Sequence, residues 1–272
     1  MNVFNVGRGA ARNLLPPAVT LAIILLGWEA YSRLVLDAIP GGSRLLPAPT
    51  AVIASLVTNA NDLAVNTWQT VVETVIGLAL ALVVGFGFAL VIDLSPLMRR
   101  AIYPLLVVSQ TIPLLALAPL LVLWFGFGIL PKILVVGLVC FFPIVVAGVD
   151  GFRSTDPELI RLFRTFGAGR WTIFRQVRLP GALPFLFSGI RIAVTYCVIG
   201  AVWGEYVGAQ YGLGIFMQSK QHAFDVATVF ACVVVISALS VALFLLTSLI
   251  ERVVIPWHFR GRDRSTDSNL LV

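Results

Sequence analysis

The sequence predicts an all-α, polytopic membrane protein with about six transmembrane helices. Apolar runs of about 18 residues or more recur along the chain, and in proteins such runs cross bilayers as helices. Only 12% of the 272 residues are charged, whereas roughly a quarter are charged in soluble domains. This composition excludes a soluble enzyme, because runs of that kind would aggregate in water.

The order of the apolar runs defines one membrane domain over residues 17–259. It is preceded by a cytoplasmic tail over 1–16 and followed by a tail over 260–272. Prolines at 104, 113 and 119 interrupt the third run, and glycines at 77, 85 and 87 predict close helix packing on the second. The expected spans are 17–36, 66–92, 102–124, 132–149, 182–203 and 225–254.

The segments between the spans are expected to be loops or short surface helices. A short amphipathic helix is predicted at 50–60, after a Pro- and Gly-rich loop at 37–49. A short loop is predicted from Ser95 to Arg100 and a tight turn at 125–131, and 204–224 is a second polar interval.

The distribution of basic residues predicts the orientation. With six spans, one side of the membrane holds 14 of the 19 Lys and Arg residues and the other holds 4. Because basic residues accumulate in cytoplasmic loops, both termini and the long loop at 150–180 are expected in the cytoplasm. The same rule explains the net charge of +6 without nucleic acid as a partner.

The loop at 150–180 is the longest polar interval of the chain and contains six arginines. Asp156 is a good helix N-cap, Pro157 suits the first helical position and Glu158 suits the positive end of the helix dipole. Gly167 lies where a left-handed C-terminal cap belongs. The pattern predicts a short helix between two membrane spans.

This predicted helix is amphipathic. Leu159, Leu162, Phe163 and Phe166 recur at helical spacing and form one apolar stripe, while arginines 161 and 164 fall on the opposite side. A second helical segment is expected from 170 to 178, and Leu179-Pro180 should end it. The stripe could dock in a partner protein or lie on lipid headgroups, and the residues alone do not separate these.

The segment 161–180 resembles the cytoplasmic loop of permease subunits of bacterial ATP-binding-cassette (ABC) importers. That family has Glu-Ala-Ala, three residues, Gly, nine residues, Ile, one residue and Leu-Pro. Here Gly167, Leu179 and Pro180 match the pattern, and Val177 replaces the isoleucine. Arg161-Leu162-Phe163 takes the place of the Glu-Ala-Ala triplet, which is a departure from the family.

The resemblance extends over nearly the whole chain. LLPAPTAVIASL, QTIPLLALAPLLVLWFGFG and GEYVGAQYGLGIFM resemble the branch that imports nitrate, taurine, alkanesulfonates and thiamine pyrimidine precursors. Glu73, four residues before Gly77, and VRLPGALPFLFSGIRIAVTYCVIGAVWGE are most similar to permeases for thiamine pyrimidines or riboflavin. The resemblance therefore implies an inner-membrane permease for such a heterocycle. Sulfonate, taurine or nitrate import is the alternative substrate class.

The resemblance also implies partners. Two permease copies would pair, each docking its loop helix on a cytoplasmic ATPase subunit that binds ATP and Mg²⁺. A periplasmic or lipid-anchored binding protein would deliver the solute. The residues expected to couple to the ATPase are Asp156, Glu158, Leu159, Arg161, Leu162, Phe163, Arg164, Phe166, Gly167, Leu179 and Pro180.

Polar residues in or near the spans are candidates for the translocation path, because buried ionisable groups in membranes are often functional. They are Glu73, Gln110, Thr111, Pro113 and Glu205. The alternative is structural: Glu205 would be a polar group at a helix end and Glu73 would pair with a neighbouring basic residue. Aromatic residues cluster at the predicted outer ends and form either an interfacial belt or a stacking surface for a flat solute: Trp124, Phe125, Phe127, Trp203 and Tyr206.

Other functions find little support in the chain. No GxxxxGK[ST] motif is present, so ATP hydrolysis must be performed by a partner. The three cysteines lie in predicted spans without metal-ligand spacing and are expected to be small core residues. We therefore predict neither a catalytic site, a metal site nor a cofactor of its own. A stand-alone secondary transporter is the competing class, although the chain lacks internal repeats.

Overall fold

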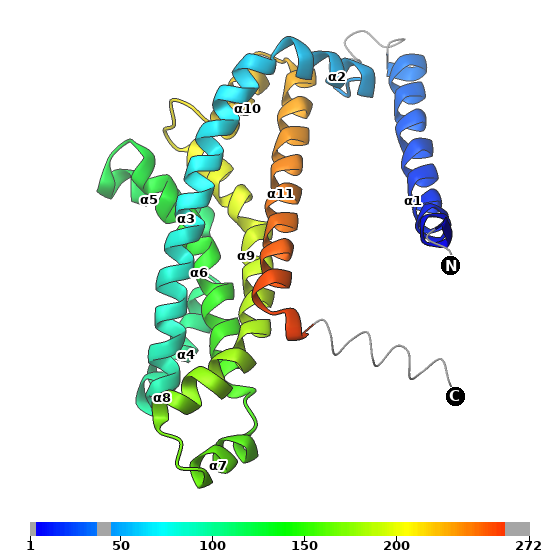
Figure 1. Cartoon of the computed structure of the whole chain (residues 1–272). Helices are drawn as coiled ribbons and strands as arrows, with labels where there is room; N and C mark the ends of the chain where they lie inside the picture. The colour runs from blue at the N-terminus through cyan, green and yellow to red at the C-terminus, as the bar shows by residue number, and fades with distance from the viewer. Residues whose placement is uncertain (1–3, 37–44, 259–272) are drawn as a thin grey trace. The chain divides into compact units, whose positions relative to one another are not determined.

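The computed structural model describes residues 4–36 and 45–258, and within these ranges it contains helices and turns but no strand. Five helices in the described ranges are long and apolar enough to cross a membrane: Leu15–Val35, Ala60–Leu94, Ile129–Arg153, Arg170–Tyr206 and Val226–Val254. The all-α, polytopic class predicted from the sequence is therefore confirmed (Figure 1). The expected loop residues 37–44 and the tail at 260–272 lie outside the described residues.

The helices follow one another with short connections. In chain order they are α1 (Phe4–Tyr31), the π-helix η1 (Ser32–Leu36), α2 (Pro49–Thr58), α3 (Ala60–Leu94), α4 (Pro96–Ser109), α5 (Leu114–Phe125), α6 (Ile129–Arg153), α7 (Pro157–Thr165), α8 (Arg170–Ile173), the π-helix η3 (Phe174–Arg178), α9 (Leu179–Tyr206), α10 (Leu213–His222) and α11 (Val226–Val254). The chain divides into two compact units, which we describe separately: residues up to 64 with 216–235, and the remainder.

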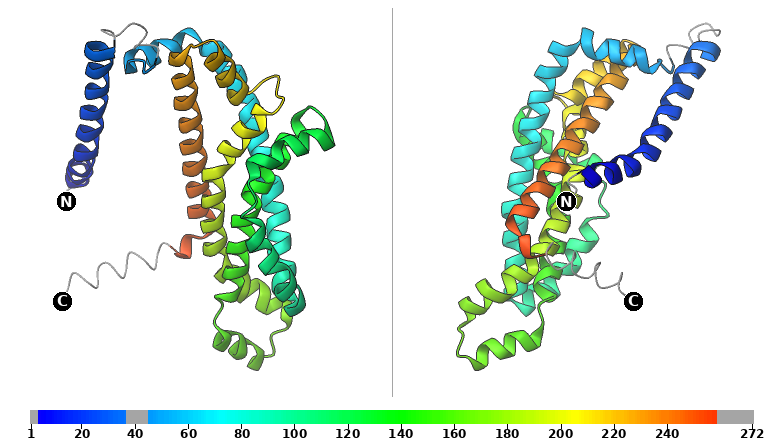
Figure 2. Two further views of the ribbon diagram at one scale, coloured as in Figure 1. Left: turned by 180° about the vertical axis from the view of Figure 1, so that it is seen from behind. Right: turned by 45° about the vertical axis from the view of Figure 1, so that its right-hand side comes forward.

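The core of the larger unit is the pair α6 and α9, which pack against each other along their length (Figures 1 and 2). Small residues fill this contact, including the fully buried Cys140, Ala193 and Cys197. Gly189 lets the helices approach closely, since a Cβ there would lie 2.5 Å from Ala147 Cβ and 2.7 Å from the Pro143 carbonyl oxygen. Such small-residue contacts are a common means of packing helices in membranes.

The close packing predicted for α3 is confirmed at two of its three glycines. A Cβ on Gly77 would lie 2.5 Å from Val136 Cβ, and one on Gly85 would lie 2.9 Å from Ile144 Cγ2, so both positions press against α6. Gly87 differs, because nothing lies within 4 Å of its Cβ position.

These glycines yield a matched pair of substitutions. Gly189→Val should destabilise the protein by about 3 kcal/mol, because the added side chain collides with Ala147 and with backbone that cannot move aside. Gly87→Val introduces the same side chain into open space and should leave stability unchanged within about 0.5 kcal/mol. Thermal unfolding of the two purified variants in detergent measures the difference. Equal unfolding temperatures would contradict the close packing of α6 against α9 at Gly189.

The expected third span, 102–124, is divided into two helices. Helix α4 ends at Ser109 and α5 begins after Pro113, which has an extended ψ of 103° and disfavours a helical conformation at Ile112. Residues 95–100 are not a loop as expected. Ser95 Oγ accepts a hydrogen bond from Met98 N at 3.3 Å and caps α4, with Pro96 in its first turn.

The expected helix end at Leu179-Pro180 is wrong. Helix α8 passes through the π-helix η3 into α9, so residues 170–206 form one continuous helical segment. Pro180 lies directly after the π-helix η3, where the amide of Leu179 donates to the carbonyl of Phe174 five residues earlier, and this wider turn accommodates the proline within the continuous helical segment. The polar interval 204–224 is likewise not all loop, because it contains α10.

The smaller unit contains the predicted helix at 50–60, observed as α2. Ser55 Oγ on α2 lies 2.8 Å from Thr228 Oγ1 on α11, and Asn59 Nδ2 donates to the same oxygen at 3.3 Å. Asp225 Oδ1 caps α11 by accepting from Thr228 N at 3.2 Å. These bonds tie α2 to the beginning of α11.

Candidate functional site

Helix α7 is the predicted helix of the 150–180 loop, and its caps are formed as expected. Asp156 Oδ1 accepts a hydrogen bond from Glu158 N at 2.8 Å, with Pro157 in the first turn. At the other end Gly167 has φ +77°, and the amides of Gly167 and Ala168 donate to the carbonyls of Arg164 and Phe163 at 2.9 and 3.0 Å. This pair of bonds is a Schellman cap, which requires the left-handed backbone that glycine readily adopts.

The apolar stripe of α7 is exposed to the surroundings of the chain. No residue of α7 is buried, and the exposed fractions reach 41% for Leu159, 50% for Leu162 and 80% for Phe166. Arginines 161 and 164 are exposed as well. A capped helix that leaves its large apolar side chains uncovered has the character of a docking element rather than of core.

The base of this loop is fixed to the bundle by an ion pair that the sequence analysis missed. Asp93, whose side chain is fully buried at the end of α3, accepts at Oδ1 from Arg178 Nη2 at 2.7 Å and from Arg99 Nη2 at 3.2 Å. Arg178 Nη2 also lies 3.4 Å from the Phe152 carbonyl oxygen. The triad therefore connects α3, α4 and the π-helix η3, which carries the connection from α8 into α9.

At the opposite end of α6, Glu73 and Lys132 form a buried ion pair. Lys132 Nζ donates to Glu73 Oε1 at 2.9 Å, and their side chains are 7% and 0% exposed. Gln69 Nε2 donates to the same carboxylate oxygen at 2.8 Å. The alternative expectation for Glu73, a basic partner, is thus met by Lys132. Its second oxygen, Oε2, is buried without a hydrogen-bond partner among the described residues.

Glu205 is also buried, and it caps α10. Its Oε2 accepts a hydrogen bond from Gly214 N at 2.5 Å, and its Oε1 accepts from Thr70 Oγ1 at 2.6 Å. Leu213 N donates to Thr70 Oγ1 at 2.9 Å, and Gly212 N donates to Asn66 Oδ1 at 2.8 Å. Three side chains thus accept from the first amides of α10. This arrangement favours the structural interpretation of Glu205 over contact with solute.

The glycines after Glu205 explain how the carboxylate fits. Gly212 has φ +136°, and its α-carbon lies directly against the carboxylate of Glu205, with no room for a side chain. A Cβ on Gly214 would lie 2.9 Å from Glu205 Oε2. The Gly-Leu-Gly sequence at 212–214 was the signal in the sequence for a buried group beside the start of α10.

The remaining path candidates lie at the break between α4 and α5. Gln110, Thr111 and Pro113 are exposed, and Thr111 Oγ1 donates to the Val108 carbonyl at 2.7 Å. Among the described residues, neither the hydrogen bonds of Glu73 given above nor those of Glu205 involve these three. The structure therefore separates the five path candidates into a buried polar network and an exposed helix break.

Within the membrane-spanning helices, Arg191 Nη1 of α9 pairs with Glu251 Oε2 of α11 at 2.9 Å. In the part of the chain that the structure describes, no group of three or more His, Cys, Asp or Glu side chains is arranged to hold a metal ion.

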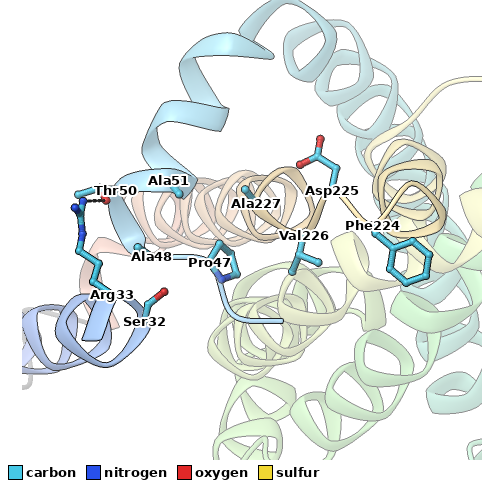
Figure 3. A pocket seen from close by; sticks show the side chains of 10 residues that line it. All are labelled: Ser32, Arg33, Pro47, Ala48, Thr50, Ala51, Phe224, Asp225, Val226 and Ala227. Atoms are coloured by element: carbon cyan, nitrogen blue, oxygen red, sulfur yellow. Dashed lines mark hydrogen bonds between the residues drawn. The ribbon is translucent and has the colours of Figure 1, made fainter. Parts of the chain in front are cut away.

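The smaller unit has a cavity of about 520 Å³ of its own (Figure 3). It is lined from η1, the start of α2 and the start of α11. At its edge Arg33 Nη2 donates to Thr50 Oγ1 at 2.9 Å, as the dashed line shows. Phe224, which has φ +56° and is 77% exposed, borders it on the other side.

An all-α membrane protein with a capped amphipathic helix, whose apolar face is exposed, has the features of a transporter subunit that is driven by a soluble partner. Comparison with protein families matches residues 77–256 to the binding-protein-dependent transport system inner membrane component. The chain belongs to this family. It is a multi-pass permease subunit of an ABC importer, a class that works with a binding protein and with ATPase subunits in which ATP hydrolysis takes place.

Individual relatives agree with this assignment. The formylaminopyrimidine transport permease protein ThiX of Halalkalibacterium halodurans is 37% identical over 245 residues, covering 90% of this chain and 96% of the relative. The riboflavin transport system permease protein RibX of Chloroflexus aurantiacus is 38% identical over 161 residues, covering 59% and 60%. The taurine transport system permease protein TauC of Escherichia coli is 31% identical over 246 residues, covering 88% of each.

A solved structure supports the fold. An inward-facing conformation of the MetNI methionine ABC transporter superposes with a TM-score of 0.60 and 21% sequence identity, covering 69% of this chain and 93% of the other. The expected type I importer permease fold is thereby confirmed.

Proposed function

We propose that the chain imports a planar nitrogen heterocycle, either a thiamine pyrimidine precursor or a riboflavin-like compound, as one half of a permease homodimer. Each copy docks α7 on one cytoplasmic ATPase subunit, which binds ATP and Mg²⁺. A periplasmic or lipid-anchored binding protein delivers the solute to the other face. The observation that carries the coupling role is the exposed apolar stripe of α7 between two formed caps.

The orientation rests on charge and geometry. The excess of basic residues predicts that both termini and the 150–180 loop are cytoplasmic. Helix α6 separates the α7 end from the Glu73–Lys132 end by its whole length. Its 25 residues at about 1.5 Å each span about 37 Å, which exceeds the hydrocarbon thickness of a bilayer. The Glu73–Lys132 end then belongs to the outer side.

The second copy is supported by the break between α4 and α5. Irregular backbone is tolerated at membrane depth where protein covers it or where it lines a water-filled path. In a single chain, Gln110, Thr111 and Pro113 are exposed at this break. A second copy facing the break would cover it and enclose a path between the two chains.

The substrate class is supported by relatives that the chain matches at 37% and 38% identity, named for formylaminopyrimidine and for riboflavin. The alternative is a small anion such as a sulfonate, taurine or nitrate, since a taurine permease is 31% identical. The competing stand-alone transporter is not retained, because the family operates with a binding protein.

Uptake by the reconstituted complex tests this function. Permease, ATPase and binding protein in proteoliposomes should accumulate labelled formylaminopyrimidine or riboflavin when ATP is enclosed on the ATPase side. An ATPase lacking its phosphate-binding lysine should abolish the signal. ATP-driven uptake of taurine with no uptake of either heterocycle would establish the alternative class. Uptake driven by an ion gradient without the ATPase would contradict the permease role.

A further inference from the structure

A cavity of about 480 Å³ lies at the end of the larger unit that is opposite α7. Its walls come from α3, from the start of α6 and the turn before it, and from the turn after α9. The side chains that could contact a ligand are those of Gln69, Phe127, Ile129, Lys132, Gln210 and Tyr211. The volume falls in the range of small-molecule binding sites.

A buried ion pair, Lys132 with Glu73, adjoins this cavity through its lysine. Lys132 lines the cavity, and its ammonium group donates one hydrogen bond to Glu73 Oε1 at 2.9 Å. An ammonium group has three hydrogens, so Lys132 keeps donors for a ligand. Behind it, Glu73 Oε2 is buried without a partner among the described residues. A ligand or a water molecule that reached this oxygen would supply the hydrogen bond that it lacks.

Aromatic rings form two of the walls. Phe127 and Tyr211 line the cavity and are 82% and 58% exposed, so neither ring is used to build the core of the chain. Phe127 stands between two glycines of positive φ, and its ring lies against a third, Gly208, where a Cβ would approach within 2.6 Å. The backbone thus holds this ring at the cavity edge.

We propose that this cavity is a solute-binding site in the permease itself, specific for a flat, uncharged nitrogen heterocycle. The rings of Phe127 and Tyr211 would stack on the faces of the heterocycle. The amides of Gln69 and Gln210 and the ammonium of Lys132 would meet its ring nitrogens and carbonyl oxygens. The proposal rests on the proposed function, because it makes this site the place where the solute enters the path.

The charge of the site argues against an anionic solute. Lys132 is the only cation among the described residues that line the cavity, and Glu73 already neutralises it. Glu205 interacts electrostatically with both and can add only negative charge. The ion pair therefore leaves no net positive charge to attract an anion. A sulfonate or nitrate would lose its hydration here without gaining a counter-charge, whereas an uncharged heterocycle does not face that cost.

Direct binding to the purified permease–ATPase complex, without binding protein, tests the site. Riboflavin is a suitable probe because stacking on aromatic rings quenches its fluorescence, and formylaminopyrimidine and taurine serve as competitors. We expect riboflavin to bind and formylaminopyrimidine to displace it, whereas taurine should not. Phe127→Leu and Tyr211→Leu should each weaken binding by about tenfold, the usual effect of losing one stacking ring.

The controls separate folding from binding. Trp124→Leu removes an exposed aromatic ring that does not line the cavity and should leave binding unchanged. Glu73→Gln combined with Lys132→Met removes both charges of the pair, so that neither residue is left as a buried charge without the other, and should also weaken binding. Failure of ATP-driven uptake of any heterocycle by the wild-type complex would refute the proposed function. If uptake is normal, any of three results would overturn the cavity as the binding site. These are no binding of riboflavin, displacement of riboflavin by taurine, or unchanged riboflavin affinity in the Phe127→Leu and Tyr211→Leu variants.

Discussion

Replacing Phe166 with aspartate is expected to abolish copurification of the ATPase and ATP-driven uptake. Phe166 is 80% exposed in the single chain, so its burial against the ATPase would contribute about 2 kcal/mol to docking. An aspartate at the same position also brings an unpaired carboxylate into that contact, which costs several kcal/mol more. Together these effects predict a loss in affinity of about a thousandfold or more. Pull-down of the ATPase by tagged permease measures this loss in affinity.

Thr165→Asp is the matched control for this substitution. It adds the same charge to the same helix, but one residue earlier, which turns the side chain by about 100° away from the apolar stripe. Docking should fall much less, provided that both variants remain inserted and monodisperse. If Phe166→Asp retains the ATPase as well as Thr165→Asp does, the stripe lies on lipid headgroups instead.

The α7 helix was predictable because its signals are local. Asp156, Pro157 and Gly167 specify the two ends through side-chain and backbone geometry that involves only a few neighbouring residues. Its arrangement does not depend on the rest of the bundle. The departure of Arg161-Leu162-Phe163 from the family triplet has no local consequence, since the helix forms with these residues on its surface.

The expected helix end at Pro180 failed for a reason that a local rule does not capture. Proline removes one N–H and collides with the carbonyl four residues earlier in a regular α-helix. Here the turn before it widens into the π-helix η3, and the helical segment continues into α9. Arg178, at the end of η3, is bonded to Asp93, a residue 85 positions away, so tertiary contact helps to hold this turn.

The polar network around Glu73 and Glu205 was predicted as a set of residues but not as an arrangement. An isolated glutamate in an apolar run indicates a buried charge with some partner. The identity of that partner depends on how α3, α6 and α9 pack against one another. The sequence contains no direct record of that packing. Lys132, Thr70 and Asn66 were therefore not assigned to the network, although all three lie in it.

Removing the guanidinium group of Arg178 should destabilise the base of the loop at 150–180, which we call the coupling loop. In Arg178→Met, the fully buried carboxylate of Asp93 keeps only its longer bond to Arg99, at 3.2 Å. Removing one partner of a buried ion pair lowers the free energy of unfolding by about 3 kcal/mol at the low end of the usual range. We expect this lower value here because both arginines partly reach water. We expect a lower unfolding temperature in detergent and reduced ATP-driven uptake, because η3 joins the α7 loop to α9.

Arg175→Met is the control, since Arg175 is exposed in the same π-helix and its loss should change neither measurement. A double variant gives a stricter test. Asp93→Leu added to Arg178→Met replaces the pair by apolar side chains and should recover part of the lost stability, because no carboxylate then remains buried without its partner. Recovery of the unfolding temperature without recovery of uptake would assign the ion pair a role in transmitting motion from α7 to α9. If Arg178→Met matches Arg175→Met in both measurements, the Asp93 triad contributes nothing to the coupling loop.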